Sequence, residues 1–347
     1  MMKNNQLLNV KNLKVFFPIT SLSLLRRKIG FVRAVDDVSF TIRRGETLGL
    51  VGETGSGKTT VGRSILRAVK ITEGTITFSI NGEEVELSSL KGKDLRNFRH
   101  HMQLIFQDPY SSLNPRMTAR DIIAEPLIAN KLVDKNKVDE IVQETALNCK
   151  LNIEHLRRFP HAFSAGQRQR ICIARALVSK PEFVVCDESV AALDVSIQAE
   201  ILNLLMDLQD EFQLTYLFIA HDLSVVAHIS NRVAVMYVGQ MVELASTNEL
   251  FNSPRHPYTE SLLSAIPEVD PDIETKPVSI KGEIPNPANP PSGCRFHTRC
   301  PYAQGKCRSE EPEWREIEEK HFAACHFSDE LDLVGVSKRI NLPKHES

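Results

Sequence analysis

The stretch "GETGSGKT", Gly52 to Thr59, contains residue types that can bind the phosphate groups of a nucleotide. Glycines at this spacing let successive backbone N–H groups turn toward phosphate oxygens, and a following helix directs its positive end at the same oxygens. Lys58 would neutralise the terminal phosphates, and the hydroxyl of Thr59 would hold Mg²⁺. The predicted nucleotide-binding residues here are Gly52, Glu53, Thr54, Gly55, Ser56, Gly57, Lys58, Thr59 and Thr60.

A second group of reactive side chains ends the apolar run "FVVCDE", Phe183 to Glu188. Asp187 stands at the C-terminal end of a predicted buried strand, where it can reach the Mg²⁺ shell. Glu188 is placed to polarise a water for in-line attack on the γ-phosphate. The two stretches together predict a site that binds ATP with Mg²⁺ and hydrolyses the nucleotide.

Short apolar runs alternate with amphipathic segments over residues 1 to about 265, and these elements must position both stretches. The runs "ETLGLVG", "MQLIF", "FVVCD" and "TYLFIA" are nearly continuous, which is typical of strands buried on both faces of a parallel sheet. Helical spacing covers residues 118–129, 137–148, 166–178 and 197–211. The segments "RAVDDVSFTI" and "RVAVMYVGQMVELA" favour flanking antiparallel strands. The predicted fold class is α/β, a P-loop NTPase.

The composition fits a soluble globular protein, with 42% hydrophobic and 25% charged residues. A formal net charge of −2 gives no sign of a polyanion-binding surface, so nucleic acid is not expected as a partner. No window approaches the roughly 18 apolar residues of a spanning helix, and the N-terminal residues lack a signal-peptide pattern. We therefore expect a protein that is soluble or that reaches a membrane only through partners.

Five motifs stand in an order that resembles the ATP-binding subunits of ABC transporters over about residues 7–265. They are "IFQDP" with Gln107, "FSAGQRQR", "VVCDE", "ALD" ending at Asp194, and "AHD" with His221. The resemblance implies an ABC-type fold with a helical subdomain at about 108–180 and a flanking antiparallel β subdomain. It implies Glu188, His221 and Gln107 as catalytic residues and Thr59, Gln107 and Asp187 as the Mg²⁺ set.

The resemblance also implies that two such subunits face each other head to tail around ATP. The signature residues Ser164, Ala165, Gly166 and Gln167, together with Asp194, would then contact nucleotide. An aromatic residue before the phosphate loop usually stacks on adenine in this family. Phe16 and Phe17 are both available, and we choose Phe17. Ala165 replaces the first of the two usual signature glycines, and Ser189 replaces a usual proline, which puts the competence of the composite site in question.

Further segments resemble the oligopeptide/dipeptide importer ATPases, and in particular the second ATPase of the oligopeptide system. They include "QDPYSSLNPRMT", "SPRHPYTESLLSAIPEVDP" and "PPSGCRFHTRCPYA". The resemblance implies a peptide-import motor on the cytoplasmic face of the cell membrane. Its implied partners are a second homologous ATPase in a heterodimer, two membrane permease subunits and, indirectly, an extracytoplasmic peptide-binding protein. The alternatives are a non-transport ABC ATPase and a partner subunit whose ATP binding is mainly structural.

The C-terminal part begins with a Pro-rich linker at 266–292, followed by a cysteine-rich subdomain at 293–327 and a polar tail at 328–347. Cys294, Cys300, Cys307 and Cys325 have the spacing C-x5-C-x6-C-x17-C. A disulfide framework is not expected in a reducing cytosol. Zinc sites usually contain a tight C-x2–4-C pair, which is absent here, whereas a [4Fe–4S] cluster tolerates wider spacing. The segment resembles the cysteine-rich C-terminal region of peptide-importer ATPases, and the resemblance implies such a cluster because some members carry one. We therefore favour [4Fe–4S], with zinc or free thiols as alternatives.

Overall fold

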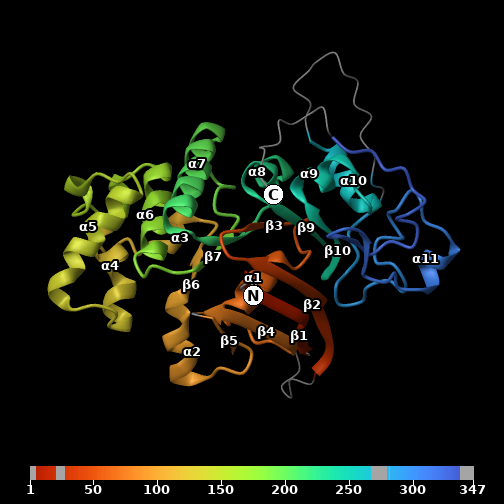
Figure 1. Ribbon diagram of the computed structural model, residues 1–347, viewed down its shortest axis with the longest axis horizontal. Coiled ribbons are helices and arrows are strands. Elements are labelled where there is room, and N and C mark those ends of the chain that lie inside the picture. The colour runs from red at the N-terminus through yellow and green to blue at the C-terminus, as the bar shows by residue number, and fades with distance from the viewer. Residues whose placement is uncertain (1–4, 21–27, 81, 267–279, 281, 337–347) are drawn as a thin grey trace, which may run out of the picture. The chain divides into compact units, whose positions relative to one another are not determined.

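The computed structural model describes residues 5–20, 28–80, 82–266, 280 and 282–336. The described residues form two compact units. The first unit takes in those within 1–6, 42–46 and 89–219, and the second those within 7–41, 47–88 and 220–347. Figure 1 colours the chain by residue number, from red at the N-terminus to blue at the C-terminus, so each element can be followed by its label and colour.

A parallel sheet lies at the centre of the first unit. Strand β6 (Met102–Ile105) pairs with β7 (Phe183–Asp187), and β7 pairs with β8 (Thr215–Ile219). Every residue of β7 and β8 is buried, which explains why these runs are apolar without alternation. The predicted parallel strands are therefore confirmed.

Side chains cap the N-termini of two long helices of the first unit. Thr118 accepts a hydrogen bond from the N–H of Asp121 at the start of α4 (Ala119–Asn130), and Ser164 accepts one from the N–H of Gln167 at the start of α6 (Ala165–Leu177). Helices α4 and α5 both pack on α6, side by side in Figure 1. The four predicted helices agree with α4 to α7 to within two residues. The helices of this unit are α2 (Gly92–Phe98), α3 (Pro109–Ser112), α4 (Ala119–Asn130), α5 (Val138–Asn148), α6 (Ala165–Leu177) and α7 (Val195–Phe212).

The second unit holds an antiparallel sheet and a mixed set of strands. The antiparallel sheet has the order β2-β1-β4-β5, from β1 (Gln6–Thr20), β2 (Lys28–Arg43), β4 (Glu73–Ile80) and β5 (Glu83–Glu86). In the mixed set, β3 (Thr47–Val51) pairs in parallel with β9 (Arg232–Tyr237). Strand β9 continues through a hairpin into β10 (Gln240–Ser246), which pairs antiparallel with it. The helix between β3 and β4 is α1 (Lys58–Ile65).

The prediction that residues 232–245 form flanking antiparallel strands holds for their pairing with each other, but β9 is not a flanking strand, because it also pairs in parallel with β3. Its residues Val233–Tyr237 are all buried, and it lies beside β3 in parallel register, with Leu50 opposite Ala234. The physical reason is the continuous apolar run "VAVMY", which suits a strand covered on both faces. The antiparallel expectation holds for the β9–β10 hairpin.

The C-terminal residues continue the sheet of the second unit. Strand β12 (His321–Ala323) pairs antiparallel with β10, and β11 (Arg315–Glu318) pairs with β12. His321 and Glu243 are buried and their side chains are 2.8 Å apart. The remaining helices are α8 (Leu223–Ile229), α9 (Thr247–Asn252), α10 (Pro257–Ser264) and α11 (Gly305–Ser309). Residues 267–279 and 281 of the predicted linker, and 337–347 of the predicted tail, lie outside the described residues.

Candidate functional site

The stretch Gly52–Thr59 joins β3 to α1 and needs glycine at two positions. Gly52 has φ +145°, and a Cβ there would lie 2.2 Å from the carbonyl oxygen of Met236. Gly57 has φ +108°, and a Cβ there would lie 2.2 Å from the carbonyl oxygen of Ala34. A side chain at either position would clash with these backbone oxygens, so the loop can adopt this conformation only with glycine at both positions.

Lys58 is the first residue of α1 and is buried. Its Nζ donates hydrogen bonds to the carbonyl oxygens of Gly52, at 2.6 Å, and Glu53, at 3.0 Å. The ammonium group is therefore held inside the curve of the loop, at the N-terminal end of a helix. Both the charge and the helix end favour an anion at this place.

The other predicted residues of the loop differ in exposure. Thr54 and Gly55 are exposed, whereas Ser56 is buried and donates its N–H to the carbonyl oxygen of Glu53 at 3.1 Å. Thr59 and Thr60 are half-buried in the first turn of α1, where a hydroxyl can reach a cation beside bound phosphates.

The two carboxylates lie at the C-terminal end of β7. Asp187 is buried as the last residue of the strand, and Glu188 follows with φ +49°. The left-handed backbone at Glu188 is sparsely populated for residues other than glycine, and such strain gathers at functional sites. The N–H of Glu188 donates to the carbonyl oxygen of Ile219 at 2.9 Å. The Nε2 of Gln107 donates to the Glu188 carboxylate at 2.7 Å, so the structure brings these two predicted residues together.

The signature residues form the first turn of α6. Ser164 is exposed and caps the helix, while the side chain of Gln167 accepts the N–H of Ser164 in return. Gly166 is buried, and a Cβ there would lie 2.8 Å from the Cγ2 of Ile197 on α7. Ala165 stands between them with its N–H in the unsatisfied first turn of the helix.

The remaining predicted residues are accessible. Asp194 is exposed directly before α7, and His221 is exposed directly before the residue that caps α8. Phe17 is 41% exposed on β1, whereas Phe16 is half-buried with the guanidinium of Arg33 5.9 Å from its ring centre. Phe17, the predicted adenine contact, is therefore the more exposed of the two rings.

Two residues that bind Glu53 were not predictable from any motif in the sequence. Arg299 donates two hydrogen bonds to the Glu53 carboxylate, and the hydroxyl of Tyr258 accepts the Glu53 N–H at 2.9 Å. Arg299 lies within the cysteine segment, one residue before Cys300. The only signal in the sequence was a pair of arginines between cysteines in "CRFHTRC".

The four C-terminal cysteines line one small cavity of about 10 Å³, the space of about one water. Burial raises the pKa of Cys294 to about 11 and the pKa of Cys300 and Cys325 to about 12. Among the described residues, no three His, Cys, Asp or Glu side chains stand in a geometry that holds a metal ion. The predicted thiols therefore converge, but they are not arranged as a formed metal site.

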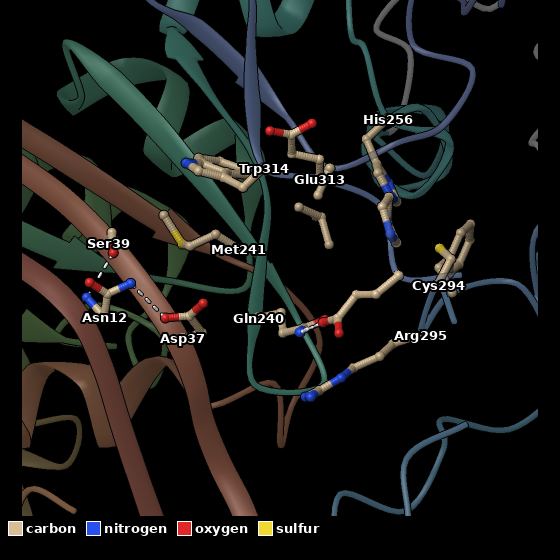
Figure 2. Close-up of a pocket in the computed structure, with 15 residues that line it drawn as sticks. Asn12, Asp37, Ser39, Gln240, Met241, His256, Cys294, Arg295, Glu313 and Trp314 are labelled. Atoms are coloured by element: carbon tan, nitrogen blue, oxygen red, sulfur yellow. Dashed lines mark hydrogen bonds between the residues drawn. The ribbon is translucent and has the colours of Figure 1, made fainter. Parts of the chain in front are cut away.

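A larger cavity of about 430 Å³, shown in Figure 2, is also lined by Cys294. Arg295 runs along its lower edge and Trp314 along its upper edge in that view. His256 lines the cavity too. Burial lowers the pKa of His256 to about 3, so the ring is neutral, and its Nδ1 accepts the N–H of Tyr258 at the start of α10.

Comparison with protein families identifies two parts of the chain. Residues 35–191 match the ABC transporter family, and residues 242–307 match the C-terminal region of oligopeptide/dipeptide transporters. The chain is 50% identical to an oligopeptide transport ATP-binding protein, AppF of Bacillus subtilis, over 92% of this chain and 97% of that protein. The chain belongs to the ABC transporter ATP-binding proteins of the oligopeptide/dipeptide type. It is an ATPase subunit, as the motif order implied.

Other members of this family are similar over nearly the same length. A putative oligopeptide transport ATP-binding protein of Bacillus subtilis, YkfD, is 48% identical over 94% of this chain and 97% of that protein. A putative peptide import ATP-binding protein of Brucella ovis is 47% identical over 93% of this chain and 98% of that protein.

Solved structures confirm the ABC ATPase fold. The ATP-binding cassette MJ0796, in a dimeric post-hydrolysis state bound to ADP and Pi, matches with a TM-score of 0.59 and 25% identity. The match covers 69% of this ABC ATPase and 98% of that chain. The cbiO1 protein of Clostridium perfringens matches with a TM-score of 0.60 over 72% of this chain and 91% of that one.

Proposed function

We propose that this ABC ATPase binds and hydrolyses ATP to drive the import of peptides through a membrane transporter. The observation that carries the proposal is the similarity to AppF over 97% of that protein, together with the match of residues 242–307 of this chain to the C-terminal region of oligopeptide/dipeptide transporters. The geometry supports the ATPase step through the glycine-dependent loop around Lys58 and the Gln107–Glu188 pair.

Each catalytic role follows from where the side chain lies. Lys58 and the N–H groups of the loop would neutralise and orient the phosphates, while Thr59 and Asp187 would bind Mg²⁺. Glu188 would orient the attacking water as its general base, and Gln107 would hold the Glu188 carboxylate and take part in the Mg²⁺ shell. His221 would sense the γ-phosphate from its exposed position. Mg²⁺ itself would supply charge neutralisation on the phosphate oxygens.

The signature turn is proposed to act on the ATP of a second subunit. Ser164 is exposed at the N-terminus of α6, where free N–H groups and the helix dipole favour an anion. In a head-to-tail pair, this turn and Asp194 would close over the nucleotide on the partner's phosphate loop. ATP then joins the two subunits, and hydrolysis removes the bridging charge.

Ala165→Gly is expected to raise ATP hydrolysis at the partner's site by up to about tenfold, because it removes a methyl group that crowds the γ-phosphate. Nucleotide affinity of the isolated subunit should stay unchanged, since the turn acts in trans. The measurement is single-site hydrolysis in an assembled pair whose other site is disabled. Ala162→Gly, an exposed alanine three residues earlier, is the matched control. An effect confined to ATP binding by the isolated subunit would contradict the head-to-tail assignment.

The partners follow from the proposed transport function. We expect two permease subunits in the membrane, a second homologous ATPase and, indirectly, an extracytoplasmic peptide-binding protein. The ATPase would be bound peripherally at the cytoplasmic face of the membrane. Within the described ranges, no helix has both the length and the apolar character needed to span a bilayer.

The test is ATP-dependent peptide uptake into vesicles that contain the assembled transporter. We expect uptake that needs this subunit, ATP and Mg²⁺ together. ATPase activity without association with permease subunits would favour the alternative of a non-transport ABC ATPase. Uptake that continues when the Glu188 site is inactivated would favour a subunit whose ATP binding is mainly structural.

For the cysteine segment we propose a [4Fe–4S] cluster held by Cys294, Cys300, Cys307 and Cys325, with zinc as the alternative. The support is that all four thiols line one cavity, and that their wide spacing lacks a tight zinc pair. The present cavity has room for about one water, so a cluster requires the surrounding loops to separate. The bound group would act as a structural staple for a loop-rich segment.

Anaerobic purification is expected to give a brown protein with broad absorbance near ~400 nm and about four irons per chain. Cys300→Ser should abolish this absorbance. The control is Cys149→Ser, which replaces a buried thiol of the first unit and should leave the absorbance unchanged. Elemental analysis that finds stoichiometric zinc and no iron would reject the cluster. Finding neither metal would reject a metal-binding role for these thiols.

A further inference from the structure

A residue of the cysteine segment is ion-paired with the phosphate loop. Nη1 and Nη2 of Arg299 donate to the two carboxylate oxygens of Glu53 at 2.7 and 3.1 Å. This is the parallel, two-bond geometry in which arginine binds a carboxylate most strongly. The Arg299 side chain is 8% exposed and that of Glu53 25%, so water screens the pair only in part.

Arg299 is itself fixed in place. Its Nη1 also donates to the hydroxyl of Tyr237 at 3.2 Å, and its N–H donates to the carbonyl oxygen of Phe296 at 2.9 Å. The rings of Tyr237, Tyr258 and Phe296 pack together, with centroids 4.6 to 5.3 Å apart. The guanidinium therefore projects from a rigid aromatic cluster rather than from a free loop.

Glu53 is anchored on its backbone as well as on its side chain. Its N–H donates to Tyr258 at 2.9 Å, and its carbonyl oxygen accepts from Lys58 at 3.0 Å. The same turn is closed by two further hydrogen bonds. Lys58 donates to the carbonyl oxygen of Gly52, and the N–H of Ser56 donates to the carbonyl oxygen of Glu53. The Arg299–Glu53 pair is therefore one support of the backbone whose N–H groups would face phosphate.

The charge of Glu53 makes its pairing important for binding. A carboxylate in a phosphate loop repels a triphosphate. In a partly buried site this repulsion is stronger than in bulk water, because the effective dielectric constant is lower. Arg299 cancels this charge with a cation that stays protonated at any physiological pH. Without Arg299 the loop would present an unpaired carboxylate to ATP.

We propose that Arg299 is a positioning residue for ATP binding, through which the cysteine segment forms part of the nucleotide site. It neutralises the Glu53 carboxylate, so that the phosphate loop does not present an unpaired negative charge to the phosphates. The inference rests on the proposed ATP-binding function of that loop. It assigns to the C-terminal extension a role in nucleotide affinity in addition to its own folding.

The test measures the Kd for MgATP of the full-length subunit. Arg299→Ala should weaken binding about tenfold, which corresponds to about 1.4 kcal/mol, the scale of one charge-assisted hydrogen bond. Removing the orphaned charge should restore affinity, so the double variant Glu53→Gln/Arg299→Ala should bind within about threefold of wild type. Arg299→Lys keeps the charge without the paired hydrogen bonds and should fall between Arg299→Ala and wild type.

Arg295→Ala is the matched control. Arg295 is also 8% exposed and pairs with a carboxylate of the second unit, that of Asp36, and it donates to the carbonyl oxygen of Val238, so these two partners lie outside the phosphate loop. It lines the cavity of Figure 2 instead. Its loss should lower the melting temperature and change the Kd by less than about twofold.

Three results would overturn the inference: wild-type affinity in Arg299→Ala, a double variant that binds no better than Arg299→Ala, or an equal loss of affinity in Arg295→Ala. The last two would mean that Arg299 only maintains the fold. Failure of the wild-type subunit to bind MgATP would instead overturn the proposed function, and the inference with it.

Discussion

Glu188→Gln is expected to slow ATP hydrolysis by at least the ~10²-fold that general-base assistance contributes, while ATP binding stays intact. The amide cannot accept the proton of the attacking water. It can still accept the hydrogen bond that Gln107 now donates to the carboxylate, so the local structure should survive. Because charge neutralisation by Lys58 and Mg²⁺ is untouched, the variant should accumulate as a closed, ATP-bound pair. The measurements are turnover in the assembled transporter and nucleotide retention after rapid gel filtration.

Glu182→Gln is the control for this prediction. Glu182 immediately precedes β7, whereas Glu188 immediately follows it, and Glu182 pairs with Arg44 and His101 instead of facing a nucleotide site. The same chemical change there should alter stability but leave turnover within about twofold, as expected for a partly exposed pair. Near-normal turnover in Glu188→Gln would remove Glu188 from the general-base role.

Much of the fold could be predicted because its signals are local. The strands β7 and β8 are continuous apolar runs, and the helices around them show regular apolar spacing with capping residues such as Thr118 and Ser164. The parallel pairing of β9 with β3 was not predicted, because a run of buried residues does not reveal whether its neighbour is parallel or antiparallel. That choice depends on a strand almost two hundred residues earlier in the chain.

Local sequence signals likewise predict one part of the candidate site but not the contacts between distant residues. The phosphate loop was predictable, because glycines at this spacing followed by Lys and Thr are typical of the backbone conformation that binds phosphate. The link between Glu53 and Arg299 was not, since it joins residues 246 positions apart and no spacing rule applies at that distance. The convergence of the cysteines was expected from their density, whereas the small volume between them depends on packing by Phe296, Tyr302 and Phe327.

Lys58→Ala is expected to weaken MgATP binding by at least about 100-fold, the loss expected when two charge-assisted hydrogen bonds to phosphate disappear. The ammonium is already held inside the loop by the carbonyl oxygens of Gly52 and Glu53. It therefore needs little reorganisation to meet a phosphate, and its charge acts in a site where Lys58 is almost fully buried. The measurement is the Kd of the isolated subunit for MgATP by titration calorimetry.

The fold should tolerate this change, because water can satisfy the two loop carbonyls and Ala is a good residue for the first turn of α1. Lys70→Ala, an exposed lysine five residues after the end of that helix, is the control and should leave the Kd within about twofold. The loss in Lys58→Ala should persist at high salt, since a buried charge is screened less than an exposed one. Unchanged affinity in a folded Lys58→Ala subunit would mean that phosphate binds elsewhere, and the roles assigned to Thr59, Glu53 and Arg299 would fail together.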